Sequence, residues 1–235
     1  MSDGPLALSF FDPARDIYGT ARSGATILFE GRRAVAHAAG PAMEETAGRW
    51  RADVTGVLEL EFAPVAEPVD VAELTAQVCR VSGRAAGRAI DCLGTIAETR
   101  SPPRWEELDA LRTISTLVDE GNAFIALSRR PRHAAGHGQE SVVAQLLREG
   151  RAVGVKETRI STVYDSAGRQ RSAGLELWLP GEELPHRGSG TVLAGSSLDL
   201  EGLRVHTAVF RWRLDGREGI GAYDVMVRAE PPAAA

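Results

Sequence analysis

Residues 58–62 alternate strictly between apolar and acidic side chains, and this alternation limits what the chain can fold into. In the stretch VLELEFAPV, Leu58, Leu60 and Phe62 alternate with Glu59 and Glu61. A period of two places successive side chains on opposite faces of a strand, so one face is buried and the other meets solvent. Similar patterns recur along the chain and predict antiparallel sheet.

Glycine-containing turns separate the alternating segments at short intervals. The stretch GATILFEGRRAVAHAAG predicts two strands joined at residues 30–33, and LTAQVCRVSGRAAGRAIDCLG predicts two more around a Gly-rich turn. Further turns are predicted at REGR, DSAGR and LDGRE. A helical turn is expected only in SPPRWEELDALRTI, where Ser101 is suited to cap it and prolines and glutamates follow. We therefore expect an all-β protein with little helix.

A break in the strand pattern near residues 96–105 divides the chain. The stretch AETRSPPRW interrupts the run of alternating segments. With 235 residues the chain is long enough for two β modules, which we place at residues 6–98 and 99–230. One continuous β domain is the alternative, because β-barrels of this length also occur.

Composition and charge narrow the class of partner. The chain is 43% hydrophobic and 25% charged, which is typical of a folded soluble protein. Its net charge of −5 argues against nucleic acid as a partner, since DNA and RNA binding needs a cationic surface. No apolar run approaches the roughly 20 residues of a membrane-spanning helix, and the N-terminus lacks the pattern of a signal peptide. We therefore expect a cytoplasmic protein without a transmembrane segment.

The stretch RHAAGHGQE contains the pattern that most resembles a metal site. His133, His137 and Glu140 are spaced so that they would share one face of a helix. Two glycines inside the stretch and a proline before it disfavour that helix. We therefore expect no metal, and because the sequence contains no phosphate-binding loop or dinucleotide fingerprint, we expect no cofactor. His133 and His137 remain candidates for the mouth of a ligand cavity.

Four stretches, taken in order, resemble a known superfamily. They are FFDPARDIYGTARSG, CRVSGRAAGRAIDCLG, VYDSAGRQRSAGLELW and RWRLDGREGIGAYDVMVR. Their order and spacing resemble the lipocalin-like superfamily that includes carotenoid 1,2-hydratase (hydroxyneurosporene synthase) and related terpene cyclases and isomerases. The resemblance implies two lipocalin-like antiparallel β-barrel or sandwich modules packed together, with a β-barrel cavity for an apolar small molecule of the isoprenoid or terpenoid kind.

The resemblance also implies proton-transfer chemistry of the lyase or isomerase type. Hydration, cyclisation or isomerisation of an alkene uses a carboxylic acid held in a dry site. Many relatives carry a Gly-x-Arg-Asp-His-Ser-Trp-Gly segment, but the corresponding stretch here, GTIAETRSPPRW, lacks the Asp-His pair. The candidate proton donors are Glu98, Glu106 and Asp109. Two functions therefore stay open: an enzyme that has kept or remade the acid, and a noncatalytic binding or accessory protein on the same scaffold.

Aromatic side chains and the two histidines are the candidate ligand contacts. Trp105 lies next to the predicted acids and is a candidate apolar wall, while Trp178 and Trp212 lie in strand-like segments. With His133 and His137 they complete the predicted binding site. Core packing is the alternative for Trp212, and a solvent-exposed turn is the alternative for the acids that follow Trp105.

Overall fold

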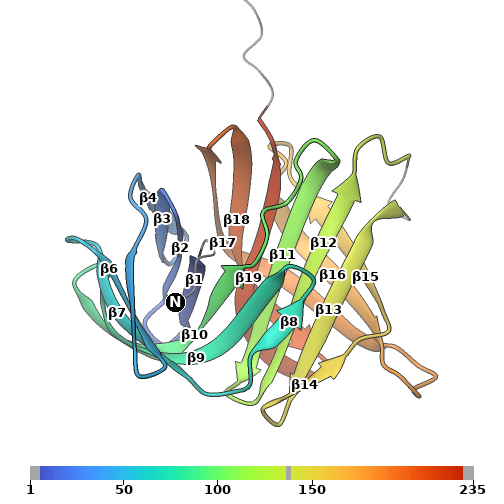
Figure 1. Cartoon of the computed structure of the whole chain (residues 1–235), viewed down its shortest axis with the longest axis horizontal. Helices are drawn as coiled ribbons and strands as arrows, with labels where there is room; N and C mark the ends of the chain where they lie inside the picture. Colours follow the sequence, from blue (N-terminus) through green and yellow to red (C-terminus); the bar gives the residue numbers. More distant parts are fainter. Residues whose placement is uncertain (1–5, 136–138, 230–235) are drawn as a thin grey trace, which may run out of the picture.

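The computed structural model describes residues 6–135 and 139–229, which form two antiparallel sheets (Figure 1). The prediction of an all-β fold with two packed modules is confirmed. Among the described residues, no helix is long and apolar enough to cross a membrane. His137 lies outside the described residues.

The first sheet is formed by residues 6–99. Its strands are ordered β4-β3-β2-β1-β10-β9-β7-β6-β5, and the short β8 pairs with β9. Their bounds are β1 (Leu6–Asp12), β2 (Ile17–Arg22), β3 (Ala25–Glu30), β4 (Arg33–His37), β5 (Ala42–Thr46), β6 (Arg49–Val54), β7 (Leu58–Pro64), β8 (Val69–Val71), β9 (Leu74–Ala85) and β10 (Arg88–Thr99).

The second sheet is formed by residues 108–228, in the order β14-β13-β12-β11-β19-β18-β17-β16-β15. The two sheets lie side by side, and β8 lies against β12 and β13 (Figure 1). The strand bounds are β11 (Leu108–Asp119), β12 (Asn122–Pro131), β13 (Ser141–Arg148), β14 (Arg151–Gly154), β15 (Glu157–Tyr164), β16 (Gln170–Trp178), β17 (His186–Leu200), β18 (Leu203–Leu214) and β19 (Arg217–Arg228).

The predicted hairpin turns form where the glycines indicate. Glu30 pairs with Arg33 across the β3–β4 turn, and the β13–β14 and β18–β19 hairpins close at REGR and LDGRE. Between β9 and β10, Ala86 and Gly87 both have positive φ, at 49° and 73°. Two successive residues of this kind form the tight turn whose twist matches the strands on either side, and glycine adopts it without strain.

The helical turn expected within residues 101–114 forms near the start of that stretch. One turn forms, closed by a hydrogen bond from the Glu107 amide to the Arg104 carbonyl at 3.0 Å. Leu108 then begins β11, which pairs with β12 on one side and β19 on the other. Pairing and burial of this central strand outweigh the local capping features.

Three hydrophobic clusters form the cores. One lies on the inner face of each curled sheet, and the third, which we call the inter-sheet core, joins the two sheets. Strand β1 contributes Phe10 to the first-sheet core and Phe11 to the inter-sheet core. Likewise β11 contributes Ile114 to the second-sheet core and Leu111 to the inter-sheet core. Central strands are therefore buried on both faces.

The outer strand β7 keeps the simple alternation expected from the sequence, with Leu58, Leu60 and Phe62 buried. The chain passes from the first sheet to the second between Thr99 and Leu108. This passage lies in the stretch where the sequence pattern breaks. The division into domains at residues 98 and 99 stays a prediction.

Candidate functional site

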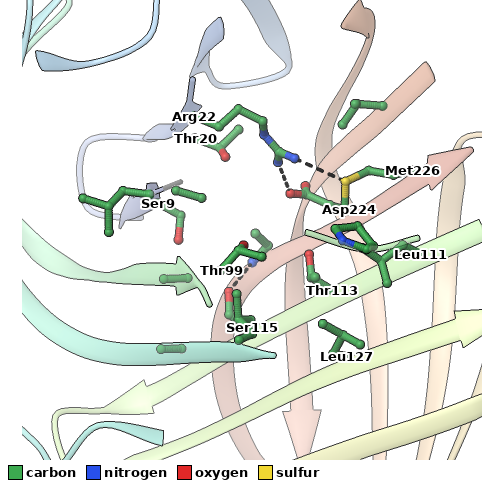
Figure 2. A pocket seen from close by; sticks show the side chains of 18 of the residues that line it. Ser9, Thr20, Arg22, Thr99, Leu111, Thr113, Ser115, Leu127, Asp224 and Met226 are labelled. Carbon is green, nitrogen blue, oxygen red and sulfur yellow. Dashed lines mark hydrogen bonds and ion pairs between the residues drawn. The ribbon is translucent and has the colours of Figure 1, made fainter. Parts of the chain in front are cut away.

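A cavity of about 280 Å³ lies between the two sheets (Figure 2). The first sheet contributes β1, β2, β9 and β10, the second contributes β11, β12, β18 and β19, and residues 102–105 of the connecting passage close one side. The sequence places a ligand inside a β-barrel. The inner face of each sheet instead packs into its own hydrophobic core, so this cavity forms where the modules meet.

Most of the cavity wall is apolar. Aliphatic side chains come from both sheets, and the Trp105 indole comes from the passage between them. A wall of this kind favours burial of an apolar ligand surface, at about 25 cal/mol for each Å² removed from water. The apolar lining includes Leu6, Leu74, Ala76, Ala97, Leu111, Ile125, Leu127, Leu203, Val205 and Met226.

A row of hydroxyl groups crosses the first sheet at the cavity wall. Ser9 is the register partner of Thr20 on β2 and of Thr95 on β10. The Ser9 and Thr95 hydroxyl oxygens are 2.7 Å apart and form a buried hydrogen bond. Since cross-strand partners point to the same face of a sheet, the three hydroxyls form one polar band in the wall.

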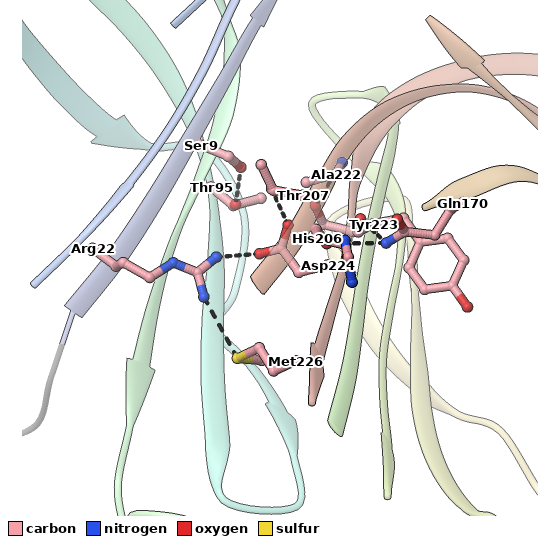
Figure 3. Close-up of polar contacts among 11 residues, drawn as sticks. Ser9, Arg22, Thr95, Gln170, His206, Thr207, Ala222, Tyr223, Asp224 and Met226 are labelled. Carbon is pink, nitrogen blue, oxygen red and sulfur yellow. Dashed lines mark hydrogen bonds and ion pairs between the residues drawn. The ribbon is translucent and has the colours of Figure 1, made fainter. Parts of the chain in front are cut away.

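A second polar row crosses the other sheet. Asp224 on β19 is the register partner of Thr113 on β11 and of Thr207 on β18. The Thr207 hydroxyl donates a hydrogen bond to the Asp224 carboxylate from a buried position (Figure 3). Thr113 and Asp224 line the cavity. Thr207 therefore holds the Asp224 carboxylate in place at the cavity wall.

Arg22 joins the two sheets at this point. From β2 its guanidinium donates to the Asp224 carboxylate, and its other amino group lies 3.6 Å from the Met226 sulfur (Figures 2 and 3). The Arg22 side chain is 18% exposed and that of Asp224 is 9% exposed. A charge-assisted contact of this kind is stronger than a neutral hydrogen bond. It fixes both the carboxylate and the packing of one module on the other.

A second ion pair crosses between the sheets beside the cavity. Glu73, in the turn before β9, lines the cavity and accepts a hydrogen bond of 3.1 Å from Nε of Arg129 on β12. A second amino group of Arg129 contacts the other carboxylate oxygen. The buried charges at the cavity wall, on Arg22, Asp224 and Glu73, are therefore all neutralised by partners on the opposite sheet.

Among the predicted ligand contacts, Trp105 lines the cavity, and the other described ones lie elsewhere. Trp212 is buried in the second-sheet core, stacked on Phe210 with ring centroids 5.3 Å apart. Trp178 lies on β16 with the Arg159 guanidinium 4.7 Å from its ring centre. His133 is exposed at the end of β12.

The predicted proton donors do not converge on the cavity. Glu106 and Asp109 are exposed, and Asp109 accepts a hydrogen bond of 3.2 Å from the His133 backbone amide. Glu98 lies on β10 next to Ala97, which lines the cavity, so the glutamate points to the other face of the strand.

Arg22 and Asp224 were missed because they are 202 residues apart in the chain. The available signal is a charged residue inside an otherwise apolar strand, as in the stretch AYDVMV. Such a residue is seldom buried without a partner. The pattern marks Asp224 as unusual but does not identify Arg22.

No group of three His, Cys, Asp or Glu side chains within the described ranges is arranged to hold a metal ion. Of the proposed metal motif, His133 is exposed, whereas Glu140 is buried and pairs with Arg112 at 3.2 Å. These two side chains therefore lie in different environments.

No protein-family model and no curated protein matches this sequence. Solved structures that share its fold include the following two. A candidate AttH protein from Nitrosomonas europaea is 14% identical with a TM-score of 0.64, and the match covers 96% of this chain and 94% of that one. Kievitone hydratase from Nectria haematococca is 9% identical with a TM-score of 0.56, covering 97% and 90%. Both likenesses establish the fold, with two packed lipocalin-like modules.

Proposed function

We propose that this protein binds a neutral, mainly apolar small molecule in the cavity between its two sheets. One observation carries this proposal: the wall is largely apolar, and its buried charges are already paired across the interface. Among the described residues that line the cavity, a ligand carboxylate would meet no free cation, and it would approach Asp224 and Glu73. The two hydroxyl-bearing rows favour a ligand with one or two alcohol or carbonyl oxygens.

The volume limits the size of the ligand. At about 280 Å³ the cavity is roughly twice as large as an engineered cavity of about 150 Å³ that takes up benzene. This favours a compact terpenoid-like molecule of about two fused rings over an extended polyisoprenoid chain. Trp105 provides the aromatic contact.

The chemistry that this site favours is isomerisation by proton transfer at Asp224. A carboxylate held by Arg22 and Thr207 is suited to take a proton from one ligand carbon and return it to another, which leaves the atom balance of the ligand unchanged. This moves the proton-transfer role from Glu98, Glu106 and Asp109 to Asp224. The resemblance to lipocalin-like isomerases supports this class, and the fold shared with kievitone hydratase supports proton transfer more broadly. Ligand binding without catalysis is the second candidate, because the Asp-His pair of many relatives is absent.

Binding and catalysis are tested separately. Titration of a panel of neutral bicyclic terpenoid alcohols and ketones, followed by tryptophan fluorescence, should give micromolar affinity in the wild type and a loss of the signal in Trp105→Phe. If none of them binds, the proposal is wrong. For a ligand that binds, incubation in D₂O should introduce deuterium with the wild type and not with Asp224→Asn. Binding without exchange would favour the noncatalytic candidate.

A further inference from the structure

The second sheet contains a polar cluster that faces away from the cavity. Along β11, Leu111 and Thr113 line the cavity, whereas Arg112 lies between them in sequence and points to the opposite face of the strand. Ser128 on β12 is the register partner of Arg112, so their side chains share that face. Arg130 follows two residues later on the same side of β12. We propose that Arg112, Ser128 and Arg130 bind a small carboxylate at the end of the second-sheet core.

Several polar atoms of this cluster are buried without a hydrogen-bond partner. Within the described part of the chain these are Nε of Arg112, Oγ of Ser128, Nε of Arg130 and one acceptor, Oε1 of Glu140. Ser128 is 0% exposed and Arg112 is 4% exposed. A buried donor without an acceptor costs folding free energy, so native structures seldom leave one unpaired. The two guanidinium donors and the serine hydroxyl outnumber the one free oxygen of Glu140, and their adjacent positions on two paired strands indicate a further, shared acceptor.

Charge distinguishes an anion from water as that acceptor. The cluster contains two guanidinium groups, which stay protonated in proteins, and one carboxylate, Glu140. Nη1 of Arg112 lies 3.2 Å from Oε2 of Glu140, and both side chains are almost fully buried. Arg130 has no ion pair among the described residues. A water molecule would accept hydrogen bonds but leave one positive charge uncompensated. An anion accepts hydrogen bonds and also compensates the charge.

The side chains that face Arg112 from other strands of the curled second sheet do not supply the missing negative charge. Tyr223 and Tyr164 lie near Arg112, and burial raises the pKa of the Tyr223 hydroxyl well above its ordinary value. Its oxygen is 2.6 Å from the Thr162 hydroxyl oxygen, in a neutral hydrogen bond. Glu140 is therefore the acid that opposes the two arginines in the described part of this cluster.

The geometry indicates the class and size of the ligand. Glu140 already occupies the Nη1 side of Arg112, which shows that this guanidinium accepts a carboxylate. The Nε edge of Arg112 and the half-buried Arg130 side chain are left for a second carboxylate. A guanidinium group matches a planar carboxylate in a two-point contact. The second-sheet core fills the curl beneath with large side chains, including Phe124 and Trp212. A short-chain monocarboxylate fits these limits.

The probe is sodium acetate, titrated against the whole protein by calorimetry with sodium chloride added to keep ionic strength constant. The wild type should bind acetate in a saturable manner. Arg130→Gln should weaken the affinity about tenfold or more, as expected for loss of a charged hydrogen-bond partner. Arg171→Gln is the matched control, since Arg171 is exposed on β16 and its loss changes the net charge equally. It should leave the affinity unchanged.

Glu140→Gln tests the charge argument in the opposite direction. Removing the competing carboxylate should tighten acetate binding. The proposal is overturned if acetate does not saturate, or if Arg130→Gln and Arg171→Gln weaken binding equally. Arg130→Lys keeps the positive charge but not the planar guanidinium, and it should bind acetate with intermediate affinity. This variant replaces Arg130→Gln in the test if Arg130→Gln does not fold.

Discussion

Asp224→Asn should convert the inter-sheet cavity from one that prefers neutral ligands into one that binds acids. In the wild type, the Arg22 guanidinium is neutralised by the Asp224 carboxylate. The asparagine side chain has a similar shape but no charge, so the variant presents a free cation at a largely apolar wall. A ligand carboxylate would then replace the lost partner.

The size of the effect follows from the contact that the ligand would make. A hydrogen bond to a charged group contributes about 1.5–3 kcal/mol, which corresponds to a gain in affinity of roughly 10- to 140-fold. The unliganded variant should also be less stable by about 3 kcal/mol, at the low end of the cost of breaking a buried ion pair, because Arg22 remains 18% exposed. An acidic ligand should restore much of that stability.

The assay compares a bicyclic terpenoid alcohol with the carboxylic acid of the same skeleton. The wild type should bind the alcohol more tightly, and Asp224→Asn should bind the acid more tightly. Asp109→Asn makes the same chemical change at an exposed position and should keep the wild-type order. If the acid binds Asp224→Asn no better than it binds the wild type, the charge argument for the cavity is refuted.

Three further predictions concern the scaffold. Burial is the main cause that raises the pKa of both cysteine thiols, to about 12, so Ellman's reagent should react with neither until the protein is unfolded. Burial lowers the pKa of His186, but the hydrogen bonds that its ring donates to the Asp215 and Glu182 carboxylates raise it, and the net pKa lies above its ordinary value of 6.5. The difference in stability between the wild type and His186→Gln should therefore be largest below about pH 6.5. It should become smaller as the pH rises through the folded-state pKa of His186, and melting temperatures of the wild type and the variant across pH will measure it. Trp212→Ala should lower the free energy of unfolding by about 3–5 kcal/mol in urea titrations, since Trp212 is 1% exposed; a cost below 1 kcal/mol would contradict its place in the second-sheet core.

The fold could be predicted because its determinants are local. Alternation along β7 and the turns at REGR and LDGRE each specify a hairpin within about twenty residues. Residues 101–114, where the sequence predicts a helical turn, show the limit of such local signals. Ser101 and the following prolines and glutamates favour a helical turn locally, whereas β11 is determined by distant partners on β12 and β19.

The site could be predicted only where one segment determines it. Trp105 lies in the passage between the two sheets, beside the point where the sequence pattern changes, and it lines the cavity. The Arg22–Asp224 pair at the wall instead joins strands near the two ends of the chain, and these two residues meet only after both sheets have formed and packed. Glu106 is next to Trp105 in sequence but is exposed and does not line the cavity.

Strand register explains why the polar partners could not be inferred even after the unusual residues are noticed. Arg112 and Asp224 are opposite charges in two apolar strands that pair with each other, which suggests a direct contact. In the register of β11 and β19, however, Asp224 is opposite Thr113, and Arg112 is opposite Val225. A shift of one residue places the two side chains on opposite faces of the sheet. Each charge therefore needs a partner from another element, and each face of the sheet acquires its own polar site, with Arg22 at the cavity and Glu140 in the second-sheet core.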